Sequence, residues 1–262
     1  MTDATQTPRH GGRWLIRRVR RPDAAAHLYC FAHAGGAPGE YVRWADDLPE
    51  IQVWAVQPPG RASRLAERPF TRMTALVEAV VDQVTFEGPF ALFGHSLGAL
   101  VAFEVARSIR ARGLPGPVRL FASSCSAPTA IRTTKRLHLL SDADLLAEIE
   151  RRWGPMPAEA RSDPLLLETA LGCYRADFAL LDAYEYVQSG PLECPITVLV
   201  GDREPGRARA IAWRAQATGP FDLHTLPGGH LYFRESRREL CELLRWTMNS
   251  DLGERCERGS TQ

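Results

Sequence analysis

Apolar runs alternate along this chain with segments of helical periodicity, and this alternation limits the fold more than any other feature. Helical spacing of apolar residues occurs in segments 73–84, 97–112 and 234–248. The apolar runs that indicate strands lie before or between these segments, at 27–33, 51–57, 90–94, 118–124, 196–201 and 221–227. Strands that are apolar throughout are typical of a parallel sheet that helices cover on both faces. The sequence therefore predicts an open, mostly parallel α/β sheet in one domain, spanning residues 26–250.

One long interval departs from this alternation. Residues 134–188 contain no convincing strand but several helical segments, with a Gly-Pro-Met-Pro break at 154–157. An insertion of this length exceeds an ordinary crossover between parallel strands. We therefore expect a helical lid over the carboxyl edge of the sheet. Its apolar side chains fill the lid core or shape a pocket, and the candidates for the pocket are Leu145, Leu146, Trp153, Leu167, Phe178 and Leu181.

The two ends of the chain differ from the predicted domain. Residues 1–25 are polar and rich in arginine, which predicts a loosely held, basic N-terminal arm. Within this arm, residues 13–19 also suit an edge strand. Residues 251–262 are predicted to form a C-terminal tail.

The composition argues against several classes of protein. The formal net charge of +1, with 45% apolar and 24% charged residues, gives no case for nucleic acid or membrane binding. No signal peptide or transmembrane run is apparent. The cysteine spacings are unlike those of metal sites or disulfide frameworks, and the residues are Cys30, Cys125, Cys173, Cys194, Cys241 and Cys256. We expect a cytoplasmic monomer with free thiols and with no metal or cofactor.

A G-x-S-x-G pattern joins the third apolar run to the helical segment that follows it. Gly94 and Gly98 flank Ser96 and permit a sharp strand–turn–helix, in which the serine hydroxyl stands above the sheet. The amino terminus of the next helix would offer unpaired N–H groups to a developing oxyanion. A small residue in a tight turn is the simpler explanation for Ser96, but this context favours a nucleophile.

A serine nucleophile needs a base, and the sequence offers seven histidines. His230 follows the last predicted strand in a loop with two glycines, which is where this architecture places its histidine. His95 adjoins the serine and is expected to pack in the core or behind the site. His224 falls inside a predicted strand, and we expect His33 to anchor its loop. His230 is therefore the best candidate for the base.

Two carboxylates compete for the acid of a catalytic triad. Asp202 and Glu204 both follow the predicted strand at 196–201. The acid accepts the Nδ1–H of the histidine and so fixes its tautomer, which either residue can do if its side chain reaches. A spacing of three residues from Gly201 favours Glu204, and Asp202 remains the alternative.

The remaining catalytic element is a pair of N–H donors for the oxyanion. The loop after the first long apolar run contains Gly35 and Gly36, which allow the backbone a close approach. We therefore expect the N–H groups of Ala34 and Leu97 to form the oxyanion hole.

Several motifs between residues 27 and 247 together resemble one family. They read FAHAGGAPGEYVRWADDLP, VWAVQPPGR, FALFGHSLGALVAFEVAR, RADF, VLVGDREP and LPGGHLYF. This set is similar to the type II thioesterases that accompany polyketide and nonribosomal peptide synthetases, within the α/β-hydrolase superfamily. The PGR and RADF elements are not shared by α/β hydrolases in general. The resemblance implies an α/β-hydrolase fold with a mobile helical lid.

The resemblance also implies an activity. Such enzymes hydrolyse acyl or aminoacyl groups from the phosphopantetheine arm of carrier proteins, chiefly to remove stalled or wrongly primed units. This chain departs from the family pattern at two positions. Leu97 stands where methionine is usual, which leaves the backbone donor intact, and Glu204 stands where aspartate is usual. If the longer side chain misaligns the imidazole, Asp202 would substitute as the acid.

These residues lead to one hypothesis of mechanism and two alternatives. Ser96, deprotonated by His230, attacks a thioester carbonyl, and water later hydrolyses the acyl-serine ester. The alternatives are an esterase or acyltransferase that acts on oxygen esters, and a catalytically silent binder of carrier proteins. Carrier domains are typically acidic, so basic clusters are candidates for docking, although such charges more often only face solvent. The clusters are Arg107, Arg110 and Arg112, and Arg132, Lys135 and Arg136.

Overall fold

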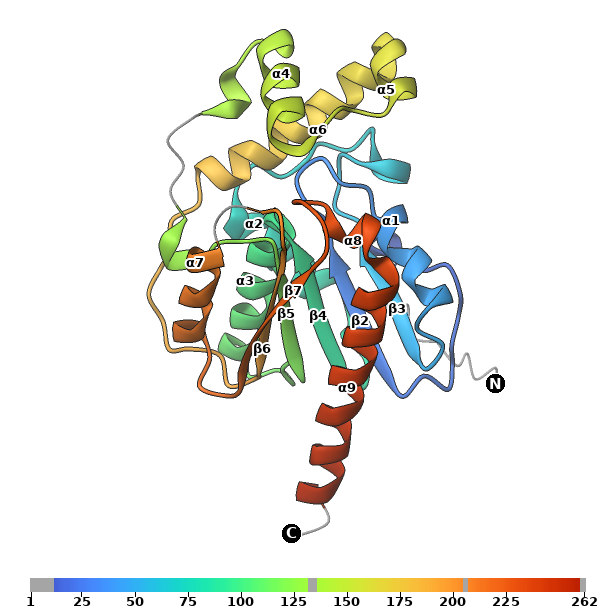
Figure 1. The fold of residues 1–262 in the computed structure, drawn as a ribbon, viewed down its shortest axis with the longest axis vertical. Coiled ribbons are helices and arrows are strands. Elements are labelled where there is room, and N and C mark those ends of the chain that lie inside the picture. The colour runs from blue at the N-terminus through green and yellow to red at the C-terminus, as the bar shows by residue number, and fades with distance from the viewer. Residues whose placement is uncertain (1–11, 132–135, 205–206, 260–262) are drawn as a thin grey trace, which may run out of the picture.

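The protein is built around one mostly parallel sheet (Figure 1). The computed structural model describes residues 12–131, 136–204 and 207–259, and the side chains in these ranges except those of 207–208 and 254–259. Within these ranges, a seven-stranded sheet has the order β1-β3-β2-β4-β5-β6-β7. β1 pairs antiparallel with β3, and the other neighbours are parallel. The strands are β1 Leu15–Ile16, β2 Ala26–Phe31, β3 Ile51–Val56, β4 Phe90–His95, β5 Arg119–Ser123, β6 Ile196–Gly201 and β7 Phe221–Leu226.

Both faces of the sheet are buried. In β2, Leu28 and Cys30 belong to one buried apolar cluster, while Tyr29 and Phe31 belong to the other. Successive side chains of a strand point to opposite faces, so a strand covered on both sides must be apolar throughout. This requirement explains why continuous apolar runs predicted the central strands, and the structure confirms the predicted α/β sheet.

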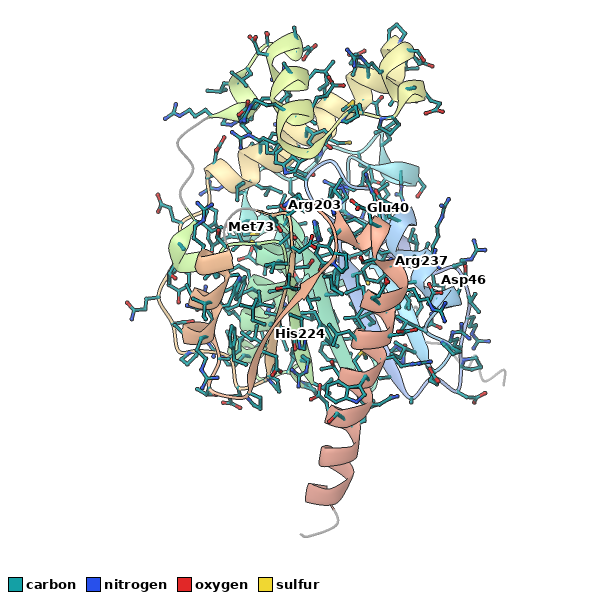
Figure 2. The ribbon with its side chains drawn as sticks, in the orientation of Figure 1. Glu40, Asp46, Met73, Arg203, His224 and Arg237 are labelled. Carbon is teal, nitrogen blue, oxygen red and sulfur yellow. The ribbon has the colours of Figure 1, made fainter. Side chains whose placement is uncertain are left out.

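Helices cover the two faces of the sheet, and side chains fill the space between the layers (Figure 2). Val80 of α2 and Phe103 of α3 lie in one cluster, whereas Tyr41 of α1 and Leu244 of α9 lie in the other. Outside the lid, the helices are α1 Gly39–Val42, α2 Met73–Gln83, α3 Leu97–Ala111, α7 Arg207–Ala210, α8 Tyr232–Glu235 and α9 Arg237–Gly259. Short 3-10 turns are Gly12–Trp14, Arg43–Asp46, Ala62–Arg64, Pro128–Ala130, Leu137–Leu139 and Ile211–Gln216.

The predicted insertion forms three helices above the end of the sheet where α3 begins (Figure 1). They are α4 Asp142–Trp153, α5 Ala158–Ser162 and α6 Pro164–Asp182. Ser141 caps α4 by accepting the N–H of Asp144, and Asp163 caps α6 by accepting two backbone N–H groups. The lid has a small apolar core of its own, formed by Leu137, Leu145, Ile149, Leu171 and Phe178.

At one end the chain forms the alternative that the sequence offered, an edge strand within residues 13–19, and at the other it departs from the predicted tail. Trp14 and Leu15 are buried and β1 pairs with β3, so the described part of the predicted arm completes an edge of the sheet. Residues 1–11 lie outside the described residues. At the other end, α9 continues to Gly259. Asp251 pairs with Arg119 of β5 at 2.7 Å, so the predicted tail begins inside a helix that is anchored to the sheet.

Candidate active site

Ser96 occupies a strained turn between β4 and α3. Its φ of 54° and ψ of −118° lie in a region that residues other than glycine rarely adopt. Gly94 and Gly98 let the turn close, because a Cβ atom at Gly98 would collide with the carbonyl oxygen of Phe31, and one at Gly94 with that of Gly98. The turn holds Ser96 between the end of β4 and the first residue of α3, which is the predicted strand–turn–helix.

Glu204 contacts His230. Oε1 of Glu204 lies 2.6 Å from Nδ1 of His230, and the two side chains are largely buried. Oε2 of the same carboxylate accepts a hydrogen bond of 2.7 Å from the Oγ of Ser124, which follows β5. Both carboxylate oxygens are therefore engaged, and the imidazole is held with Nδ1 toward the acid and Nε2 on the other side of the ring.

Asp202, the alternative acid, has another partner. Its Oδ1 accepts the backbone N–H of Gly228 at 2.8 Å, in the loop that leads to His230. Gly228 has a φ of 134°, and a Cβ atom there would collide with Tyr232. Asp202 therefore braces the histidine loop, while Glu204 reaches the imidazole itself.

Ser96 and His230 line the same small cavity, of about 20 Å³. The complete lining is His33, Ala34, Ser96, Trp153, Tyr174, His230 and Leu231. Ala34 thus shares the cavity with the serine, and Leu97 begins α3, where the first N–H groups have no acceptor within the helix. The structure thus places Ser96, His230 and Ala34 around one cavity, with Glu204 in contact with His230 and Leu97 next to Ser96 in the chain. The cavity has room for about one water molecule, so an acyl group must displace part of its lining.

Two further histidines lie beside the site and are buried. Burial lowers the pKa of His33 to about 4 and lowers that of His95 well below the usual range. Nδ1 of His33 lies 3.0 Å from the Tyr41 hydroxyl, and Nδ1 of His95 lies 2.8 Å from Oγ of Ser123. The two rings are therefore neutral near pH 7 and held by hydrogen bonds. His95 packs behind the site, as expected, whereas His33 belongs to the cavity lining and is held by Tyr41.

The lid forms the roof of the cavity. The ring of Trp153 lies 6.1 Å from that of His230 and stacks on Phe178 at 5.7 Å. Of the six lid residues predicted to shape a pocket, Trp153 lines this cavity. Leu145 and Phe178 are buried in the lid core, Leu146 and Leu167 pack against that core, and Leu181 packs against the main core.

Two residues of the site were not predicted from the sequence. Tyr174 lines the cavity from α6, one residue before the RADF segment that marked the resemblance. Ser124 has a φ of 47°, and its contact with Glu204 spans 80 positions. A serine at the end of an apolar run carries no signal of such a contact, because the contact depends on how two loops meet.

Comparison with known proteins identifies the family. A sequence profile of the thioesterase domain matches residues 26–247. The chain belongs to the thioesterase family. It is therefore a hydrolase of thioesters with the α/β-hydrolase fold.

The thioesterase is similar to proteins of antibiotic biosynthesis. It is 34% identical to the gramicidin S biosynthesis protein GrsT of Aneurinibacillus migulanus, over 88% of this chain and 92% of GrsT. It is 36% identical to the thioesterase PikA5 of Streptomyces venezuelae, over 88% of this chain and 83% of PikA5. The structure of the type II thioesterase BorB from the borrelidin biosynthetic cluster superposes with a TM-score of 0.82 at 36% identity, covering 91% of this chain and 99% of BorB. The predicted resemblance is confirmed.

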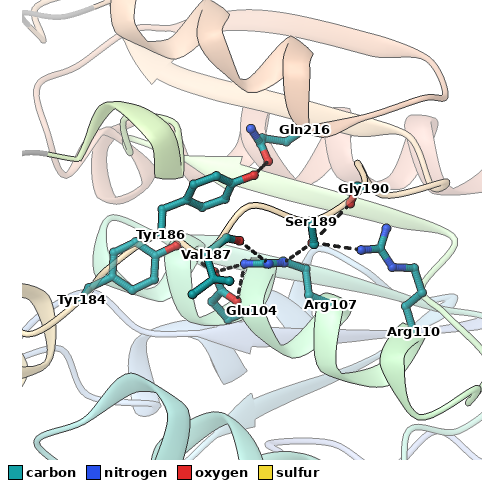
Figure 3. A network of polar contacts seen from close by, with 9 residues as sticks. All are labelled: Glu104, Arg107, Arg110, Tyr184, Tyr186, Val187, Ser189, Gly190 and Gln216. Carbon is teal, nitrogen blue, oxygen red and sulfur yellow. Dashed lines mark hydrogen bonds and ion pairs between the residues drawn. The ribbon is translucent and has the colours of Figure 1, made fainter.

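One of the two basic clusters of the thioesterase is engaged within the chain (Figure 3). Arg107 donates to the carboxylate of Glu104, to the carbonyl oxygen of Val187 and to the hydroxyl of Ser189. Arg110 donates to the carbonyl oxygen of Pro191 and to Ser189, and Arg112 pairs with Asp82. The contacts of Arg107 and Arg110 tie the segment after the lid to α3, and the Arg112 pair joins the end of α3 to α2, so this cluster has a structural role. In the second cluster, Arg136 is exposed, and Arg132 and Lys135 lie outside the described residues.

A larger groove, of about 900 Å³, lies at the amino ends of β5, β6 and β7, whereas the Ser96 cavity lies at the carboxyl end of β4. His224 of β7 and Trp246 of α9 line it, and Figure 2 shows His224 far from the lid. His224 is not part of the lining of the Ser96 cavity and lies in β7, in agreement with its prediction as a strand residue. Among the described side chains, no group of three or more His, Cys, Asp or Glu is arranged to hold a metal ion. No helix in the described ranges is both long and apolar enough to cross a membrane.

Proposed function

We propose that this thioesterase hydrolyses acyl and aminoacyl groups from the phosphopantetheine arm of carrier proteins, and so edits a polyketide or nonribosomal peptide synthetase. The observation that carries the proposal is the contact of Glu204 with His230, which shares one cavity with Ser96. Relatives named for gramicidin S biosynthesis and for the borrelidin cluster support the pathway.

The mechanism uses two steps at Ser96. In the first, Nε2 of His230 takes the proton of the hydroxyl as Oγ attacks the thioester carbonyl, and the thiol leaves with that proton. In the second, His230 deprotonates a water molecule that attacks the acyl-serine ester, and Oγ recovers its proton. Glu204 stabilises the imidazolium that forms in each step. The N–H groups of Ala34 and Leu97 bind the negative oxygen of both tetrahedral intermediates.

The partner in this proposal is an acyl or peptidyl carrier domain. The reaction requires neither a metal nor a redox cofactor, since the carrier brings its own phosphopantetheine. We further propose a cytoplasmic, monomeric enzyme. A reducing compartment is supported by five free cysteines among the described residues, which are Cys30, Cys125, Cys173, Cys194 and Cys241.

The variant Ser96→Ala tests the nucleophile. Loss of the hydroxyl should lower kcat on an acyl-carrier thioester by roughly 10⁴- to 10⁶-fold, as for other serine hydrolases. Ser250→Ala is a matched control, because Ser250 lines the groove at the amino ends of β5, β6 and β7 and not the Ser96 cavity. Undiminished turnover by Ser96→Ala would rule out this mechanism.

The two alternatives are outcomes of further measurements. Hydrolysis of matched thioester and oxygen-ester substrates separates a thioesterase from an esterase or acyltransferase that uses the same triad. A fluorophosphonate probe separates a catalyst from a silent carrier binder, since labelling requires a nucleophilic Ser96. We expect labelling at Ser96 and faster hydrolysis of the thioester.

A further inference from the structure

A buried ion pair lies next to the active site but outside the triad. The guanidinium of Arg61 donates to Oδ1 of Asp177 at 2.6 Å, and the two side chains are 10% and 2% exposed. Arg61 follows β3 in the PGR segment, and Asp177 lies on the lid helix α6 in the RADF segment. The two segments that marked the family resemblance therefore meet in space, 116 positions apart.

Both members of the pair also hold the loop that follows β2. Oδ2 of Asp177 accepts the backbone N–H of Gly35 at 2.8 Å, and Arg61 donates to the carbonyl oxygen of Gly36 at 3.3 Å. These are the two residues that follow Ala34. The ion pair thus fixes the backbone on one side of the proposed oxyanion donor.

The lid helix packs directly on the same loop. Gly35 has a φ of 69°, and a Cβ atom there would collide with the ring of Tyr174, which lies on α6. Sγ of Cys173 donates to the carbonyl oxygen of Gly60 at 3.1 Å, which joins α6 to the PGR segment as well. Contacts from Cys173, Tyr174 and Asp177, within little more than one turn, therefore seat α6 on the loops beneath it.

The energetics of the pair indicate a positioning role. Burial by itself lowers the pKa of Arg61, but the Asp177 carboxylate outweighs this effect and the net pKa is raised. The guanidinium of Arg61 therefore remains charged. Burying two charges is unfavourable unless every lone pair and proton finds a partner, and apolar replacements are often as stable. A contribution to stability alone therefore does not explain why a charged pair is buried here. Its hydrogen bonds to the backbone of Gly35 and Gly36 do explain it.

We infer that Asp177 and Arg61 are positioning residues of the oxyanion hole, which fix the Ala34–Gly36 backbone and couple it to the lid helix. The inference rests on the proposed function, because it takes the Ala34 N–H as an oxyanion donor. It has a consequence for lid movement. A displacement of α6 would release Gly35, so the oxyanion hole is complete only when α6 is seated, and opening must come from α4 and α5.

The test is the double variant Arg61→Met/Asp177→Leu, assayed on an acyl-pantetheine thioester. Apolar side chains of similar size avoid leaving one buried charge without its partner, which is strongly destabilising. The Gly35 N–H loses its acceptor. Since removal of one oxyanion donor lowers kcat by about 10²- to 10³-fold, misplacement of Ala34 should lower kcat by roughly 10- to 100-fold with KM within about threefold.

A second variant and a control separate positioning from folding. Asp177→Asn serves as the test if the double variant does not fold. It leaves one acceptor oxygen for two donors, the Gly35 N–H and the Arg61 guanidinium, and should lower kcat by about tenfold. The control is Arg119→Met/Asp251→Leu. It replaces another buried ion pair, with 2.7 Å between the guanidinium and the carboxylate, at the amino end of β5 and away from Ser96. All rates are expressed per Ser96 titrated with fluorophosphonate, so that unfolded enzyme does not count.

The outcomes are distinct. A loss of kcat in the Arg61/Asp177 variants, with the Arg119/Asp251 variant within twofold of the wild type, is the expected result. A kcat within twofold of the wild type in the Arg61/Asp177 variants, or an equal loss in the control, would overturn the inference. Turnover by Ser96→Ala would instead overturn the proposed function, and this is measured independently.

Discussion

The hydroxyl of Ser124 donates a hydrogen bond to one carboxylate oxygen of Glu204, while the other oxygen contacts His230. The two distances are 2.7 Å to Oε2 and 2.6 Å to Oε1. Glutamate is one methylene longer than the aspartate usual at this position. Here the carboxylate of the longer side chain is held in place because each of its two oxygens has a partner. The departure from the family pattern therefore leaves the imidazole supported by a carboxylate whose two oxygens are both engaged.

Glu204→Gln and Asp202→Asn should differ widely in kcat. An amide at 204 does not stabilise the imidazolium, so kcat should fall by roughly 10²- to 10⁴-fold. An amide at 202 still accepts the Gly228 N–H, so kcat should stay within about fivefold of the wild type. Steady-state hydrolysis of one acyl thioester by both variants measures this. A greater loss in Asp202→Asn would transfer the role of acid to Asp202.

Ser124→Ala should lower kcat by about tenfold, because a hydrogen bond to a charged carboxylate contributes about 1.5–3 kcal/mol and part of it is replaced by water. KM should change little, since Ser124 is not part of the cavity lining. Ser126→Ala, two residues further along, is the comparison. Equal kcat values for Ser124→Ala and the wild type would show that Glu204 needs no second contact.

The central sheet was predictable from the sequence because each buried strand must be apolar on both faces. Leu28 to Phe31 illustrate this, with side chains that alternate between two cores. Ser96 and His230 were predictable because a strained turn and a glycine loop leave local signatures. The spacing from Gly201 favoured Glu204 over Asp202 but left Asp202 as an alternative, since the choice depends on the conformation of one loop. The Arg61–Asp177 pair was not predictable either, because it joins distant segments that only the packing of α6 brings together.

Gly35→Ala and Gly113→Ala should separate steric conflict from backbone strain. Both glycines have positive φ, 69° and 65°, so an alanine at either site costs about 1–2 kcal/mol of backbone strain. Only at Gly35 would the new Cβ collide with a neighbour, the ring of Tyr174, which adds about 1–3 kcal/mol. Urea unfolding measures both free energies. Equal losses would mean that α6 moves aside without resistance.

The free energy of unfolding should fall as the pH is lowered from about 6.5 to 4. Burial lowers the pKa of His33 to about 4 from its ordinary value of about 6.5. The unfolded chain therefore binds a proton in this window while the folded protein does not, which removes up to about 3 kcal/mol of stability. Above about pH 7.5 the residue is neutral in both states and adds no slope. His33→Asn should flatten this part of the curve, and an unchanged slope would contradict the assignment.

Trp153→Ala should widen the range of acyl groups that reach Ser96. The indole roofs a cavity of about 20 Å³, and its removal frees space next to His230 without touching the triad. The ratio of kcat/KM for a bulky acyl thioester to that for acetyl should rise by about tenfold, the effect of roughly 1.4 kcal/mol of relieved steric conflict. Trp246→Ala is the matched control, because this indole is 68% exposed and lines the groove at the amino ends of β5, β6 and β7. If both variants leave the ratio unchanged, the lid does not limit substrate size at Trp153.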